Sequence, residues 1–179
     1  VWNKAYKTEL LKNAFSKMTD FHAVMGEDFY ESVIIAYYAI SYSSIDDVLV
    51  IYNDESGISN TRKNLASIQK DLDSVAAILN GFRFFFKSYA SEHKAAVLNI
   101  ERYYVHYVYY NQILLKTIKN DRYVSVNLMK DYFSAEVTAP LLKKSKLMVT
   151  CDAVLYNIRA VIKKFIPKVL RERIKKIVC

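Results

Sequence analysis

Glycine and proline are almost missing from this sequence, whose 179 residues include 3 glycines and 2 prolines. Hairpin-rich sheets and barrels use these residues at their many turns, and phosphate-binding loops need several glycines close together. Hydrophobic residues make up 53% of the chain and charged residues 25%, a balance that excludes a disordered chain. We therefore expect a mainly α fold with long helices and a hydrophobic core of its own.

Two cysteines and three histidines limit the covalent and metal chemistry of the chain. Two thiols are too few for a disulfide framework or a four-cysteine zinc site, which favours a reducing, cytoplasmic setting. We expect Cys151 to be a buried thiol and His106 to be a packed or surface side chain. The sequence also has no run of about 18 apolar residues that would predict a transmembrane helix.

Apolar residues at three- and four-residue steps predict most of the helices. One helix begins at Glu27 and runs to about Ile40, with Glu27 and Asp28 in its first turn, where the helix dipole favours carboxylates. The last expected helix covers residues 158–178 and contains Pro167, where the helix should kink or restart. The other expected helices cover residues 3–11, 61–89, 91–119, 124–133 and 147–157.

The pattern changes between the second and third expected helices. Residues 41–52 are rich in Ile, Val, Tyr and Ser and predict one or two short strands, followed by a turn at 53–57. So few strands cannot form a stable sheet alone, so this part must pack on the helices or on a further N-terminal portion. We divide the chain into an α/β strip, residues 1–60, and a helical module, residues 61–179.

Four short elements follow one another in the first third of the chain: Trp2-Asn3-Lys4-x-Tyr6, Gly26-Glu27-Asp28 at the start of an apolar helix, Val50-Ile51-Tyr52-Asn53, and Ser56-Gly57-Ile58-Ser59. Their order and spacing resemble the second half of the catalytic domain in family-two glycosyltransferases, GT-A-fold enzymes of bacterial surface-polysaccharide synthesis. The resemblance implies the C-terminal part of such an enzyme. A short remnant of the GT-A domain would precede a multi-helix module, and the nucleotide-binding half would be missing.

The resemblance also implies roles for single residues. Asp28 corresponds to the general base of an inverting transfer, and Glu27 to its acidic neighbour. Trp2, Asn3 and Lys4 correspond to the segment that lines the donor and acceptor cleft. The chemistry requires a carboxylate within hydrogen-bond reach of the acceptor hydroxyl, because that hydroxyl must lose its proton as it attacks.

In this family an Asp-x-Asp motif holds a divalent cation and the diphosphate, and it lies N-terminal to the four elements. Asp71-Leu72-Asp73 matches the Asp-x-Asp pattern, but it lies within an expected amphipathic helix and is expected to be part of its solvated face. We therefore expect Mg²⁺ or Mn²⁺ in the longer parent and no metal site or transfer activity in this chain alone. The parent's substrates would be a nucleotide sugar and a saccharide or lipid-linked acceptor.

Positive charge is concentrated near the C-terminus. Up to Pro140 acidic and basic side chains nearly balance, whereas beyond it eleven lysines and arginines face two acidic residues. A near-neutral body is not typical of a nucleic-acid binder. Residues 158–178 combine an apolar face with lysines and arginines, which leaves three interpretations open: a helix at the inner membrane surface, a partner helix in a homo-oligomer, or a core helix with a solvated face.

The tyrosine-rich segment 103–110 has two interpretations. Tyr103, Tyr107 and Tyr110 lie at steps of four and three, which predicts a helix core or a dimer seam. A platform on which sugar rings stack is the alternative. If the likeness to glycosyltransferases is accidental, the chain would instead be a non-enzymatic α-helical interaction domain.

Overall fold

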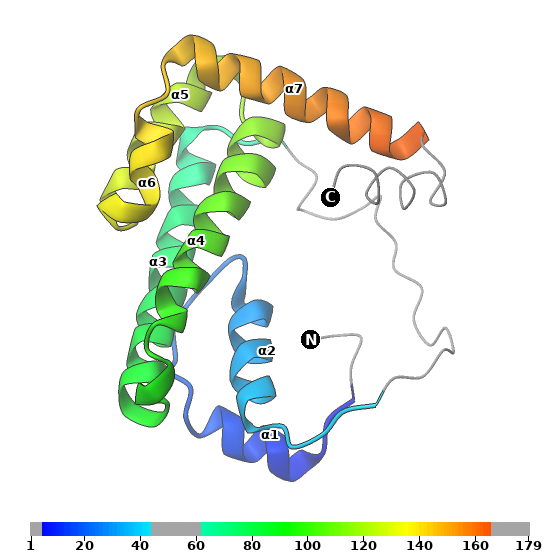
Figure 1. The fold of residues 1–179 in the computed structure, drawn as a ribbon, viewed down its shortest axis with the longest axis vertical. Helices are drawn as coiled ribbons and strands as arrows, with labels where there is room; N and C mark the ends of the chain where they lie inside the picture. Colours follow the sequence, from blue (N-terminus) through cyan, green and yellow to red (C-terminus); the bar gives the residue numbers. More distant parts are fainter. Residues whose placement is uncertain (1–4, 44–61, 166–179) are drawn as a thin grey trace.

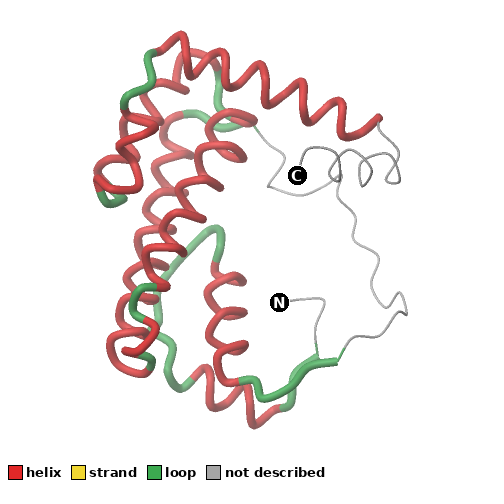
Figure 2. The backbone as a smooth tube through the Cα atoms, in the orientation of Figure 1, coloured by secondary structure: helices red, strands yellow, loops and turns green. Residues whose placement is uncertain are grey.

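The computed structural model describes residues 5–43 and 62–165, and side chains as far as residue 158. Within these ranges the chain is helical and has no β-strand, which confirms the mainly α expectation (Figures 1 and 2). Ser41–Ser43 have no regular structure, and the rest of the predicted strand region lies outside the described residues. The elements in chain order are α1 (Thr8–Phe15), α2 (Glu27–Tyr38), α3 (Leu65–Tyr89), η2 (Ser91–His93), α4 (Ala96–Tyr107), η3 (Val108–Leu114), α5 (Lys119–Leu128), η4 (Met129–Asp131), α6 (Ala135–Leu142) and α7 (Lys146–Phe165).

The antiparallel pair of α3 and α4 forms the centre of the molecule, with the two helices side by side (Figure 1). The side chain of Asn64 starts α3 by accepting a hydrogen bond from the backbone N–H of Ser67 at 2.9 Å. At this end of the pair, the backbone N–H of Lys63 donates to the carbonyl of Lys116 at 2.9 Å. The apolar stripe of α3 supplies much of the buried core: Ile68, Leu72, Val75, Ile78, Leu79, Phe82, Phe85 and Phe86.

The two ends of the α3–α4 pair are covered by different parts of the chain. α1 and α2 pack at the end where α3 finishes, and Tyr30, Ile34 and Ile35 of α2 are buried there. α5, α6 and α7 cover the opposite end, where Val149 and Ala153 of α7 are buried. The described part of the N-terminal strip, residues 5–43, therefore packs directly on the helical module.

The prediction of one regular α-helix over residues 91–119 was wrong. It divides into the short η2, the α-helix α4 and the π-helical segment η3. The wider turn of η3 is accompanied by burial of five of its seven side chains, namely Val108, Tyr109, Gln112, Ile113 and Leu114. A strict α-helical period could not have revealed this, because a π turn shifts the later residues out of phase.

Further boundaries also differ from the sequence prediction. α1 covers Thr8–Phe15 instead of residues 3–11, and α5 covers Lys119–Leu128 instead of residues 124–133. α7 runs without interruption across the expected division between residues 157 and 158. α6 was not predicted, because Pro140 lies within it and proline is a helix breaker. Contacts around its first turn stabilise this short helix: Ser134 donates its backbone N–H to the buried carboxylate of Glu101 at 2.5 Å, and Thr138 donates its hydroxyl to the carbonyl of Ser134 at 3.0 Å.

Candidate functional site

The start of α2 is fixed against α4 by one glycine. Gly26 has φ +84°, a conformation that favours glycine, and its carbonyl accepts a hydrogen bond from the Tyr104 hydroxyl at 3.0 Å. A Cβ at this position would lie 3.1 Å from both Cε1 and the hydroxyl oxygen of Tyr104. Because Tyr104 itself is buried, the first turn of α2 has a defined position on α4.

Two exposed carboxylates occupy that first turn, those of Glu27 and Asp28. No side chain caps the helix, so its N-terminal dipole favours negative charge here. Both carboxylates lie close enough to α4 to act on its tyrosines. Burial, the neighbouring Tyr103 and the charges of Asp28 and Glu27, in that order, raise the pKa of Tyr104. The pKa of Tyr107 is raised by burial, by Tyr103 and, less strongly, by Asp71 and Asp28.

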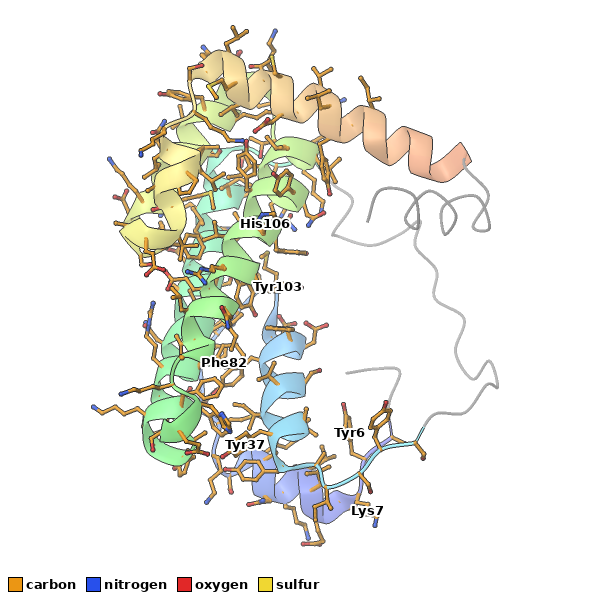
Figure 3. All side chains as sticks on the ribbon, in the orientation of Figure 1. Tyr6, Lys7, Tyr37, Phe82, Tyr103 and His106 are labelled. Carbon is orange, nitrogen blue, oxygen red and sulfur yellow. The ribbon has the colours of Figure 1, made fainter. Side chains whose placement is uncertain are left out.

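Beside the carboxylates lies a row of nearly parallel aromatic rings. Phe29 of α2 stacks on Tyr103 of α4 with ring centroids 4.7 Å apart and planes at 22°. Tyr103 in turn lies 6.3 Å from Tyr107 at 20°. Tyr103 is 48% exposed and projects from α4 just above the start of α2 (Figure 3). We call Glu27, Asp28, Phe29, Tyr103 and Tyr107 the α2–α4 site.

This arrangement combines a proton acceptor with an aromatic surface. A carboxylate can take a proton from a hydroxyl that approaches within hydrogen-bond distance. Tyr103 is half exposed, and an exposed tyrosine offers a ligand both apolar contact and a hydroxyl group. The α2–α4 site therefore combines two exposed carboxylates at the start of α2 with a half-exposed tyrosine of α4.

The structure locates two of the five residues implied by the resemblance. Glu27 and Asp28 share one helix turn, and their charges raise the pKa of Tyr104 on α4, whereas Trp2, Asn3 and Lys4 lie outside the described residues. The contact between Phe29 and Tyr103 joins positions about 75 residues apart, and no local sequence signal predicts such a pairing. Phe29, the partner of Tyr103 in this contact, had no predicted role in the site.

The expected role of the tyrosine-rich segment needs correction. The fully buried tyrosines of the segment are Tyr104 and Tyr109, not the three residues at steps of four and three. Of those three, Tyr107 and Tyr110 are partly buried against the core, and Tyr103 is half exposed. The core prediction was thus right for the segment but wrong for its face.

The expected solvated helix face is found at Asp73 but not at Asp71. Asp71 is 3% exposed and pairs with the Lys63 ammonium at 2.5 Å. Asp73 is exposed and accepts a hydrogen bond from the Tyr132 hydroxyl at 2.8 Å. In residues 5–43 and 62–158, no group of three or more His, Cys, Asp and Glu side chains could hold a metal ion.

His106 and Cys151 both lie at the surface. His106 is exposed, as a surface histidine should be, and its ring lies 4.8 Å from that of Tyr110 (Figure 3). Cys151 is exposed, so the expectation of a buried thiol was wrong. The reason is its position on the outward side of α7, away from the core.

No protein-family model, curated protein or solved structure matches this chain. Among the helices of the described residues, none has the length and apolar character needed to cross a bilayer.

Proposed function

We propose that this chain is the C-terminal part of a family-two glycosyltransferase and that Asp28 is its general base. The parent enzyme would transfer a sugar from a nucleotide-sugar donor to a saccharide or lipid-linked acceptor in surface-polysaccharide synthesis. The observation that carries the proposal is the α2–α4 site: two exposed carboxylates beside a half-exposed tyrosine ring. The order of the four sequence elements supports the same assignment.

In this proposal an acceptor sugar lies against Tyr103, with one hydroxyl directed at Asp28. Asp28 takes the hydroxyl proton while the acceptor oxygen bonds to the anomeric carbon of the donor. The bond between that carbon and the diphosphate breaks, and the nucleoside diphosphate leaves with the electron pair. The N-terminal dipole of α2 favours the ionised form of Asp28, and Glu27 is its exposed acidic neighbour.

The donor and the divalent cation belong to the other half of the proposed parent. The described residues do not offer a cation site, so no step of the proposal runs through a metal held by them. The strip of residues 1–60 would complete the GT-A domain only when joined to that half. This chain alone should therefore bind an acceptor but not transfer a sugar.

The test of the base is nucleotide release from a panel of nucleotide sugars by a protein that joins a nucleotide-binding half to this chain. Asp28→Asn should lower the transfer rate by about 10²–10⁴-fold while donor binding persists. The matched control is Glu9→Gln, because Glu9 is also an exposed carboxylate in a first helical turn. Equal rates for wild type and Asp28→Asn would remove Asp28 from the proposal.

The acceptor surface can be tested on the chain itself. Saccharides should shift the NMR signals of Tyr103 and Phe29, and Tyr103→Ala should abolish these shifts. Tyr42→Ala is the control, because Tyr42 is 95% exposed and lies outside the site. A chain that binds no saccharide, together with a transfer reaction indifferent to Asp28, would favour a non-enzymatic helical interaction domain.

A further inference from the structure

α7 has two unlike faces. Its inner face packs on the rest of the molecule through the buried side chains of Val149 and Ala153. Tyr156 on the same side donates a hydrogen bond to the side-chain oxygen of Asn111 at 2.9 Å. α7 continues beyond the end of the α3–α4 pair (Figure 1). The inner contacts therefore fix its orientation and determine which side chains point outward.

The outer face of α7 is an exposed apolar stripe. Leu147 is 72% exposed, and Leu155 is 55% exposed, although neither carries a polar group. The members recur at the three- and four-residue steps that place side chains on one side of a helix. We call them the α7 outer face: Leu147, Met148, Cys151, Val154, Leu155 and Ile158.

The sequence of this part of the chain is strongly basic. From Leu141 to Cys179 the acidic side chains are Asp152 and Glu172, against eleven lysines and arginines. Asp152 faces the body of the molecule, where it accepts hydrogen bonds from Tyr109 and Lys144. Its charge is therefore offset internally. Lys143 and Lys146, at the start of α7, are exposed.

We propose that the α7 outer face binds the surface of an anionic lipid bilayer, with the helix lying in the plane of the headgroups. Such a surface offers an apolar layer for the exposed side chains of the stripe and negative charge for the exposed Lys143 and Lys146 beside it. A second copy of this chain matches less well, because pairing two outer faces would bring two positively charged segments together. The proposed surface begins at Leu147, well before residues 158–178, and it does not depend on the glycosyltransferase assignment.

Cys151 allows a direct test, because it is exposed within the stripe. With Cys179→Ser as the background, a polarity-sensitive fluorophore on Cys151 should shift to the blue with vesicles of phosphatidylglycerol and phosphatidylcholine. Vesicles of phosphatidylcholine alone should leave the spectrum unchanged. Salt should reverse the shift, because it screens the attraction to the headgroups.

Two variants separate the apolar and charged contributions in a vesicle co-sedimentation assay. Leu147→Ser/Leu155→Ser should weaken binding by about tenfold or more, since both side chains would lose contact with the apolar layer. Lys143→Gln/Lys146→Gln should weaken it by about fivefold for each lysine removed. Phe84→Ser is the control, because Phe84 is 45% exposed on α3, away from the stripe.

Three outcomes would overturn the proposal. The first is equal binding to anionic and neutral vesicles, and the second is binding to neither. The third is a disulfide between the Cys151 residues of two copies that forms with rising protein concentration and is unaffected by vesicles, which would assign the face to self-association. Far-UV circular dichroism keeps these readings valid, because substitutions of exposed residues should leave the helix content unchanged.

Discussion

The two ends of the α3–α4 pair are held by different kinds of contact. At the end covered by α1 and α2, aromatic rings meet edge to face: Phe82 lies 4.9 Å from Tyr30 and 6.2 Å from Phe29. Tyr37 meets Phe85 in the same way at 5.4 Å. Such contacts depend on shape and burial and hardly on charge.

At the other end, charged and polar groups join the elements. Lys63, just ahead of α3, forms an ion pair with the buried Asp71 within α3. Tyr109 donates to Asp152 at 2.5 Å, and Lys144 binds the same carboxylate. One fold thus uses apolar packing at one end and ion pairs and hydrogen bonds at the other. We expect the first end to be most sensitive to loss of a buried ring, and the second to loss of a charge.

The largest effect is expected at the aromatic end. Phe82→Ala removes a fully buried ring and should lower the free energy of unfolding by about 3–5 kcal/mol, because the surrounding rings cannot fill the cavity. Urea unfolding followed by circular dichroism measures this loss. Phe84→Ala on the same helix is the control, since Phe84 is 45% exposed. Equal losses for the two variants would contradict the role given to the ring cluster.

The next effect is expected at the polar end. Asp71→Asn should lower the free energy of unfolding by about 2–3 kcal/mol, because it leaves the Lys63 ammonium without its carboxylate in a largely buried place. The double variant Lys63→Met/Asp71→Leu should recover most of this loss, because it removes both charges. Urea unfolding of the three proteins gives the comparison. If the double variant were no more stable than Asp71→Asn, the ion pair would add to the free energy of unfolding beyond the neutralisation of each charge by the other.

Gly26→Ala tests the junction that positions the α2–α4 site. We expect a loss of about 1–3 kcal/mol, from the positive φ and from the close approach to Tyr104. Tyr104→Phe, which removes only the hydrogen bond to Gly26, should lose about 1 kcal/mol. Thermal unfolding and the NMR signals of Asp28 report stability and position together. An unchanged melting temperature for Gly26→Ala would mean that α2 can shift without cost.

The smallest effect concerns pH. Burial alone would raise the pKa of Asp152, but hydrogen bonds from Lys144 and Tyr109 and the Lys144 charge bring it below its ordinary value. A lowered pKa in the folded state adds stability above the ordinary value of about 4, and this is lost as the pH falls through the folded pKa. Asp152→Asn should therefore show a smaller drop in melting temperature from pH 6 to pH 3 than wild type. Asp131→Asn, at an exposed carboxylate, should retain the full drop.

Local signals in the sequence predicted the parts of the fold that depend on neighbouring residues. The apolar stripe predicted α3 correctly to its last residue, Tyr89, and placed its start at residue 61 instead of Leu65, because one face of a helix needs no distant information. Gly26, Glu27 and Asp28 mark the start of α2 correctly for the same reason. The carboxylates of the candidate site could therefore be found before the structure.

The errors arose where distant contacts decide. Asp71 is buried because Lys63 and the segment after α4 close over it, which no helical stripe reports. Cys151 is exposed because its face of α7 has no partner helix among the described residues. The aromatic half of the α2–α4 site needed the pairing of Phe29 with Tyr103, which only the fold provides.

The π-helical segment η3 has a consequence for how the sequence can vary. Each residue of an α-helix advances the direction of its side chain by about 100°. Deleting one residue between Val108 and Leu114 would restore a regular helix and rotate everything after it relative to Tyr103, Tyr104 and Tyr107. The tyrosines would keep their place against α2, whereas Thr117 and the elements beyond would turn away from Lys63. The extra residue of the π-helical segment thus changes the direction of the later side chains. The residues before η3 can then face α2 while those after it face Lys63.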